Sequence, residues 1–268
     1  MKLILSAGSL YTLPAHQVFE MARYAGFDGM EVIINHDFSG SGARALLREL
    51  QDIHPVLSIH APFFEIDGWG NKADQLKRCA DLAINAEIPL ITFHPPNWTC
   101  FEFKFWKWLK NITDFQSEIG QNCVTIAIEN MPCLPQLKIN PYMLSGIENM
   151  VRFLEERNLY LTFDTAHCGS MHTDFLGDFH QYYDSGRMRN IHFSDYANGQ
   201  EHLFPGHGAL PLTRFLNHIR ETEYDYSLVL ELAPHEFPES SELIQETLIE
   251  LYQYIRNETR HKQMAAKG

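Results

Sequence analysis

Side chains that bind divalent metal ions recur along this chain, each in or directly after a short apolar segment. The six of them are His60, His94, Glu129, Asp164, His192 and Glu231. Neighbouring members of this set are separated by 28 to 39 residues. If the fold brings them together, the carboxylates repel one another in an apolar-walled site unless a cation is present. We therefore expect at least one divalent metal ion, and the mixture of nitrogen and oxygen ligands favours Zn²⁺ or Mn²⁺ over Mg²⁺.

Two more histidines and a tryptophan lie close to this set in the sequence. His167 follows Asp164 by three residues, and His202 precedes a glycine-rich stretch, so both are candidates for a further metal site or for substrate contact. Trp98 follows the fourth apolar segment, where an indole could line a pocket for a sugar ring or a base. The aromatic residues beyond it that we expect to pack instead are Phe105 and Trp106. The histidines interpreted as structural or solvated are His16, His36, His54, His218 and His261.

The apolar segments alternate with amphipathic stretches through eight rounds, which is typical of a parallel sheet with crossover helices. The predicted strands are Lys2–Ala7, Gly29–Ile34, Pro55–His60, Leu90–His94, Val124–Glu129, Tyr160–Asp164, Asn190–Phe193 and Leu228–Glu231. The predicted helices include Ala15–Ala25, Ala43–Gln51, Lys72–Asn85, Pro141–Arg157, Leu212–Thr222 and Ser240–Arg256. Pro141 and Pro211 suit first-turn positions, and Ser240 with Ser241 is a candidate cap for the last helix.

Eight such rounds in 268 residues predict an α/β fold, a single (β/α)8 TIM barrel. The carboxyl ends of all strands then ring one mouth, so the six metal-competent residues converge there. A doubly wound open sheet is disfavoured because no glycine-rich phosphate-binding segment follows the first strand. We expect one domain over residues 1–268, with a polar tail from about residue 257 that frays.

Composition excludes several classes of protein. No apolar run reaches the roughly 18 residues of a membrane span, and no signal segment opens the chain, so we expect a cytoplasmic protein. The net charge of −13 opposes binding to nucleic acid over most of the surface. The five cysteines are scattered, and we expect reduced, mostly buried thiols. The sequence leaves a homo-oligomer open.

Several motifs make the chain resemble the xylose isomerase-like superfamily of barrels, which joins sugar and sugar-phosphate isomerases and epimerases with endonuclease IV, the abasic-site nuclease. The resemblance spans nearly the whole chain. The matching segments are His60-Ala61-Pro62-Phe63, His94-Pro95, Ile128-Glu129-Asn130-Met131, Phe163-Asp164-Thr165-Ala166-His167, Ile191-His192-Phe193-Ser194-Asp195 and Leu230-Glu231. Gly26-Phe27-Asp28-Gly29-Met30-Glu31 is similar to a segment common among the sugar-isomerase relatives.

The isomerase and epimerase branch implies one metal ion, held by Glu129, Asp164, His192 and Glu231. Glu129 and Glu231 would then be the acid-base pair that removes and returns a proton beside a metal-polarised carbonyl. The substrate implied is a small sugar or sugar phosphate, which His167, His202 and His60 would orient. A non-catalytic barrel that binds a sugar-like ligand is a further alternative.

The nuclease branch implies three zinc ions, which add His60, His94, His167 and His202 to the central set. It also uses an aspartate two residues before the last of these histidines. Gln200 stands at that place here, and a neutral amide is a weak metal ligand. This gap leaves the third zinc site incomplete unless Glu201 replaces the aspartate, and it favours the isomerase branch. The presence of His60 and His94 keeps a site for two metal ions open.

Overall fold

The computed structural model describes residues 1–134, 139–171 and 174–260. Eight parallel strands close into a barrel in the order β1-β10-β7-β6-β5-β4-β3-β2. These strands are β1 (Lys2–Ser6), β2 (Gly29–Ile33), β3 (Val56–His60), β4 (Leu90–Phe93), β5 (Thr125–Glu129), β6 (Tyr160–Asp164), β7 (Met188–Phe193) and β10 (Ser227–Leu230). All eight predicted strands are confirmed, each to within two residues at its ends. The predicted barrel is therefore the fold.

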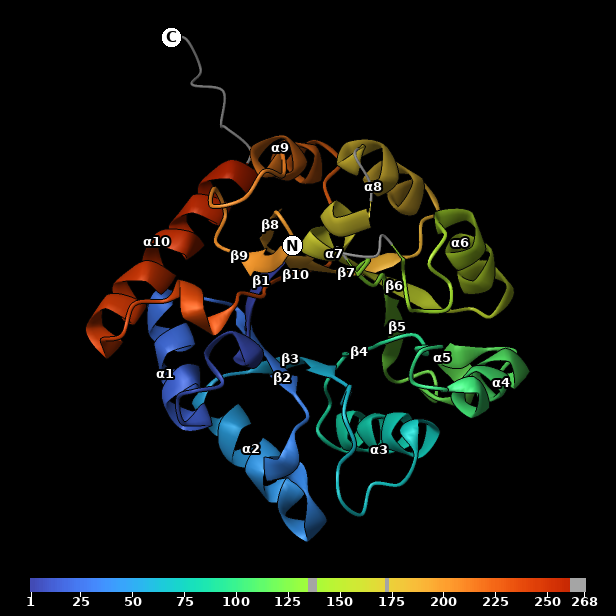
Figure 1. Cartoon of the computed structure of the whole chain (residues 1–268). Coiled ribbons are helices and arrows are strands. Elements are labelled where there is room, and N and C mark those ends of the chain that lie inside the picture. Colours follow the sequence, from blue (N-terminus) through green and yellow to red (C-terminus); the bar gives the residue numbers. More distant parts are fainter. Residues whose placement is uncertain (135–138, 172–173, 261–268) are drawn as a thin grey trace, which may run out of the picture.

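Helices form an outer ring around these strands (Figure 1). They are α1 (Ala15–Ala25), α2 (Ala43–Ile53), α3 (Lys72–Asn85), α4 (Phe103–Asn111), α5 (Phe115–Glu118), α6 (Ile147–Glu156), α8 (Phe175–Asp184), α9 (Leu212–Glu221) and α10 (Ser241–Thr259). A further helix, α7 (Thr165–Met171), and the hairpin of β8 (Asp195–Ala197) and β9 (Gln200–Leu203) lie over the barrel opening instead. They contribute His167 and His202 to the mouth.

The barrel interior contains hydrogen-bonded polar side chains, whereas the layer between strands and helices is apolar. Inside, Thr92 and Thr162 share a hydrogen bond of 2.7 Å, and the Asn190 amide donates to Thr92 at 3.4 Å. Outside, buried phenylalanines such as Phe179 and Phe215 pack with ring centroids 4.7 Å apart. Strands buried on both faces explain the nearly continuous apolar runs.

The segment before β2 fixes the amino-terminal end of the barrel. Gly26 ends α1 with a φ of 95°, a left-handed conformation that glycine adopts without strain. Asp28 accepts hydrogen bonds from the Leu3 amide at 2.7 Å and from the Arg256 guanidinium. Gly29 leaves no room for a side chain, since a Cβ there would lie 2.7 Å from the Pro55 carbonyl oxygen. The segment thus joins β1, β2 and α10.

The predicted helix from Pro141 to Arg157 is wrong in its first six residues, because α6 begins only at Ile147. The chain before it pairs with the loop after β4. Tyr142 forms an antiparallel bridge with Asn97, and the Trp98 amide donates to the Pro141 carbonyl at 2.9 Å. Tertiary pairing therefore overrides the helical pattern. Pro211, the other proline expected in a first turn, is instead the N-cap residue of α9, one position before that turn.

Other expectations have mixed outcomes. Ser240 caps α10 as predicted, with its side chain accepting from the Leu243 amide. All five cysteines are free, but only Cys79 and Cys168 are buried, so the expected burial is wrong for the exposed Cys100 and Cys123. The helix α10 continues to Thr259, and the rest of the expected tail, from 261 to 268, lies outside the described residues. Within the described ranges, no helix has the length and apolar character to cross a membrane.

Candidate metal centre

Three carboxylates at strand ends surround one imidazole nitrogen, that of His192. His192 Nδ1 lies 2.8 Å from a Glu231 oxygen, 3.0 Å from a Glu129 oxygen and 3.9 Å from an Asp164 oxygen. One potential ligand atom from each of these four residues lies within 4.8 Å of all the others. The strands β5, β6, β7 and β10 supply them, with Glu231 directly after β10. The central set predicted from sequence is therefore assembled in space.

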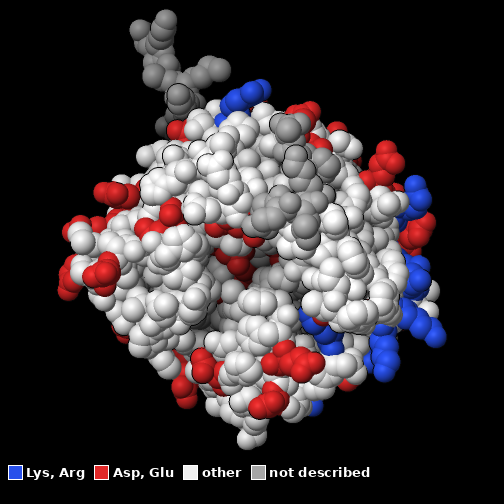
Figure 2. Space-filling model, in the orientation of Figure 1, with Lys and Arg blue, Asp and Glu red and all other residues white. Residues whose placement is uncertain are grey.

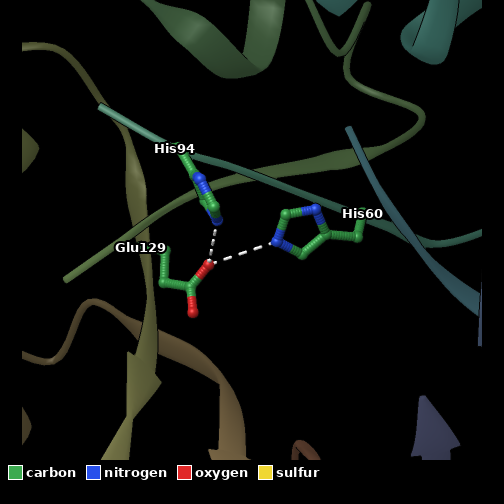
Figure 3. A group of neighbouring side chains, drawn as sticks. All are labelled: His60, His94 and Glu129. Atoms are coloured by element: carbon green, nitrogen blue, oxygen red, sulfur yellow. Dashed lines mark hydrogen bonds and ion pairs between the residues drawn. The ribbon is translucent and has the colours of Figure 1, made fainter. Parts of the chain in front are cut away.

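A second group shares Glu129 and adds two histidines (Figure 3). The Nε2 atoms of His60 and His94 lie 3.2 and 3.1 Å from the same Glu129 oxygen, Oε2. The other nitrogen of His60 lies 2.8 Å from the Ala61 carbonyl oxygen, which can only accept. His60 Nδ1 is therefore the donor, and Nε2 is free to bind a cation.

A third group consists of Asp164, His167 and His202. His167 Nδ1 donates to the Asn130 carbonyl at 3.0 Å, which leaves Nε2 directed away from the central group. Gln200 is exposed, and its neutral amide is a weak metal ligand. Glu201, however, places an oxygen 4.0 Å from His167 Nε2. The Glu201 carboxylate therefore lies near the third group, to which the Gln200 amide would be only a weak ligand.

Two residues beyond the predicted set orient the ligands. Glu31 is fully buried, accepts a hydrogen bond from the Ser58 hydroxyl at 2.8 Å, and lies 3.2 Å from His192 Nε2. The Asn130 side chain accepts from the Asp164 amide at 2.8 Å and donates to the Asp164 carbonyl at 3.0 Å. Both residues lie within the quoted motifs, but the sequence does not show that their side chains point inward.

Burial and charge perturb the titration of these groups. Burial alone would lower the pKa of His167, but the Asp164 and Glu129 carboxylates raise it to about 10. Burial lowers the pKa of His94 to about 4, since one Glu129 hydrogen bond only partly offsets it. Burial also raises the pKa of Asp164. Such opposed shifts are typical of functional sites.

The residues of the central group fit a divalent cation. Asp164 Oδ2 is fully buried and has no hydrogen-bond partner among the described residues, which is costly unless something else satisfies it. Three carboxylates of this group surround a single imidazole, and Glu31 adds a fourth from its other side. A hard cation with oxygen and nitrogen ligands would satisfy Asp164 and offset the repulsion.

A cavity of about 860 Å³ opens above these groups. Figure 2 shows carboxylates at the floor of a central hollow whose rim is mostly uncharged. Of the candidate ligands, those that line the cavity are His60, His94, Glu129, His167, His202 and Glu231. Asp164 and His192 lie below them, with no exposed surface.

The structure also shows where the aromatic residues and one histidine singled out in the sequence lie relative to the cavity. Trp98 does not line the cavity, because its indole donates to the Asn140 carbonyl and is 43 % exposed. Phe105 and Trp106 pack as expected, with the Trp106 ring stacked on Phe153 at 5.5 Å. His16 is interpreted from the sequence as structural or solvated. It lies on α1 and lines the part of the cavity away from the central group.

Comparison with known proteins identifies related sequences. The sequence profile of the family described as xylose isomerase-like TIM barrel matches residues 19–253. An uncharacterized protein from Mycobacterium leprae is 24% identical in an alignment that covers 87% of this chain and 89% of the relative. Uncharacterized proteins from Mycobacterium tuberculosis are 25% identical with the same coverage.

Solved structures share the fold at low sequence identity. A D-tagatose 3-epimerase-like protein has a TM-score of 0.69 and 18% identity, over 97% of this chain and 100% of that one. IolI protein with a bound zinc atom has a TM-score of 0.69 and 16% identity, over 97% and 98%. Endonuclease IV from Thermus thermophilus has a TM-score of 0.66 and 14% identity, over 96% and 100%.

Proposed function

The chain belongs to the xylose isomerase-like TIM barrel family, and from this premise we propose that it is a metal-dependent isomerase or epimerase acting on a sugar-like carbonyl compound. The observation that carries the proposal is the placement of Glu129 and Glu231. Both carboxylates approach His192 Nδ1, at 3.0 and 2.8 Å, and both line the cavity. A substrate above the central group would contact both of them.

Glu129, Asp164, His192 and Glu231 would hold the ion, with Zn²⁺ or Mn²⁺ preferred for this ligand set. When bound, it would supply Lewis acidity that polarises the substrate carbonyl. One of Glu129 and Glu231 would remove the proton from the carbon beside the carbonyl, and the other would return a proton. In an epimerase the proton would return to the opposite face of the same carbon, and in an isomerase to the former carbonyl carbon. His167 and His202 line the cavity and would orient hydroxyl groups.

Solvent exchange tests this proposal without knowledge of the natural substrate. Manganese-loaded protein is incubated in D2O with D-fructose, D-tagatose and D-psicose, and deuterium incorporation beside the carbonyl is followed by NMR. We expect incorporation into at least one ketose, and its loss in Glu231→Gln. The matched control Glu250→Gln changes an exposed residue of α10 and should retain full exchange. Normal exchange by Glu231→Gln would remove Glu231 from the acid-base pair.

The three adjacent groups of potential ligands support a second candidate, a zinc-dependent phosphodiesterase of the endonuclease IV type. Two features oppose it: the exposed neutral amide of Gln200 stands where the nuclease branch implies an aspartate, and no lysine or arginine among the described residues lines the cavity. Phosphate backbones are bound largely through such cations. Incubation of zinc-loaded protein with duplex DNA that contains an abasic analogue distinguishes the candidates, because nicking would favour the nuclease. Ligand binding without exchange or nicking would instead favour a non-catalytic barrel.

A further inference from the structure

The cavity extends well beyond the residues that face the metal centre. From the ends of β1 and β2 it reaches α1 and α2, and it is lined there mainly by apolar side chains. We define the apolar arm of the cavity by the residues Leu13, Phe19, Ile33, Phe38, Leu46 and Phe64. At about 860 Å³, the whole cavity lies in the upper range for sites that enclose drug-sized ligands. A simple ketose at the metal centre would leave the arm filled only by water.

The wall of the arm is continuous with the metal centre. The ring of Phe63 stacks on His94 with centroids 5.5 Å apart, and Phe64 packs edge-on against Phe63 at 5.0 Å. Two aromatic residues at the opening are unusually exposed, Tyr11 at 73 % and Phe63 at 48 %. Exposed aromatic surface beside a site is typical of a surface that a ligand covers.

The charges around the cavity argue against a phosphorylated substrate. No lysine or arginine of the described residues lines it. Lys72 lies beside the opening, but its ammonium is 3.0 Å from Glu102 and donates to the Phe63 carbonyl at 3.2 Å. The polar groups at the arm itself include Asn35, Asp37 and His16. A phosphate dianion would therefore lose its hydration without gaining a dedicated cation.

From these features we infer that the substrate is an unphosphorylated hydroxy-carbonyl compound that carries an apolar substituent, an alkyl chain or an aryl ring. The oxygen-bearing end faces the metal ligands, and the substituent occupies the apolar arm. This inference rests on the proposed function for the orientation of the polar end. It adds the substrate class, which the shared ligand set does not determine.

A series of hydroxamates tests the arm, because the hydroxamate group binds zinc while the chain length is varied. Binding of acetohydroxamate, hexanohydroxamate and octanohydroxamate to the zinc-loaded protein is measured by calorimetry, with zinc content checked before and after. Full burial of a methylene raises affinity by roughly fourfold, or about 0.8 kcal/mol. We expect hexanohydroxamate to bind more than about tenfold tighter than acetohydroxamate, since burial in the arm is partial.

Two variants and a control locate the effect. Leu46→Asn places an amide in the arm, and Ala15→Phe fills it from the first turn of α1, so each should abolish most of the chain-length gain. The control Leu243→Asn changes a leucine of α10 that is 51 % exposed and does not line the cavity. It should keep the full gain. Using two variants of different chemistry keeps the test usable if one of them fails to fold.

The outcomes separate this inference from the proposed function. Binding of acetohydroxamate with no gain along the series would overturn the apolar arm and leave the metal centre standing. Tighter binding of D-fructose 6-phosphate than of D-fructose would also overturn it, because no lysine or arginine among the described residues lines the cavity to bind the phosphate. Failure of every hydroxamate to bind zinc-loaded protein would overturn the metal centre, and the inference with it.

Discussion

At the residue scale, Glu31 determines which nitrogen of His192 faces the other ligands. Its carboxylate lies 3.2 Å from His192 Nε2, whereas Nδ1 faces Glu129 and Glu231. A carboxylate that accepts the second N–H of a ligating histidine fixes the tautomer and ring orientation. Ser58, which donates to Glu31 at 2.8 Å, holds that carboxylate in turn. Glu31 is therefore a positioning residue that acts through His192.

Replacing Glu31 should weaken metal binding more than it weakens the fold. We expect Glu31→Leu to lower zinc affinity by roughly 10- to 100-fold, the usual effect of losing such a partner. Glu31→Gln keeps an acceptor of similar shape and should recover part of that loss. Competition with a chromogenic chelator measures the affinity.

Circular dichroism provides the control for Glu31, since the residue is fully buried. A folded Glu31→Leu variant with unchanged zinc affinity would contradict the positioning role. Equal losses in the leucine and glutamine variants would indicate that packing, and not the acceptor, matters.

Sequence alone predicts which candidate ligands lie together better than it predicts the residues that contact them. His60, Glu129 and Asp164 could be predicted because each ends an apolar strand, and the barrel brings strand ends together. Glu31 lies inside β2, where both neighbours are buried and apolar. With no alternation of polarity along the strand, the sequence does not indicate that this carboxylate points into the barrel.

At the element scale, contacts at the amino-terminal end of the barrel stabilise the fold, whereas the candidate metal groups lie at the carboxyl-terminal end. Asp28 lies at the amino-terminal end of β2, where it joins the start of β1 to α10 through Leu3 and Arg256. The candidate metal ligands lie at the carboxyl ends of the strands. Separating stability at one end from chemistry at the other is a general property of this fold.

The variant Asp28→Asn should therefore destabilise the protein without changing the metal site. The amide keeps the shape but loses charge-assisted hydrogen bonds, so the free energy of unfolding should fall by about 1–3 kcal/mol. Urea denaturation measures the change. Zinc affinity should stay the same, and the exposed control Asp52→Asn should shift stability by no more than about 0.5 kcal/mol. A loss of zinc affinity in Asp28→Asn would contradict this separation of tasks.

In this chain, the local pattern of apolar residues predicts the strands more reliably than it predicts the irregular segments that connect them to helices. Continuous apolar runs locate all eight strands, because burial on both faces demands them. The segment from Pro141 to Gly146 has a helical pattern, but contacts of Tyr142 with Asn97 hold it against the loop after β4. Such contacts join residues 45 positions apart, which a local sequence pattern does not include.

At the scale of the whole molecule, acidic side chains are spread over the surface, and some of them lie in the central hollow. The net charge is −13, and Figure 2 shows carboxylates at the floor of the central hollow. Glu129, Asp164 and Glu231 lie close together there with His192, within reach of a single cation. A cation that binds only the folded state should stabilise it by mass action.

Zinc or manganese should accordingly raise the thermal midpoint of the protein. At a free metal concentration of about 100 times the dissociation constant, the stabilisation is about 2.7 kcal/mol. For a domain of this size that corresponds to a rise of roughly 5–10 °C. Differential scanning fluorimetry with and without chelator measures it. Asp164→Asn removes one carboxylate of the central group and should lose most of the rise, so an equal rise in both proteins would contradict binding at this site.

Metal binding at the group of Asp164, His167 and His202 should also depend on pH, in a direction set by the pKa of His167. Burial alone would lower the pKa of His167, but Asp164 and Glu129 raise it to about 10 in the metal-free protein. A histidine must be neutral to bind a metal, so a proton competes with the ion wherever the pH is below that value. Binding at the group that contains His167 should therefore release protons and strengthen from pH 6 to pH 8. Zinc titrations at these two pH values, each in two buffers of different ionisation enthalpy, measure the affinity and the protons released. The variant His167→Gln removes this competing group and should release fewer protons per zinc bound; equal release by both proteins would show that His167 is not displaced by the metal.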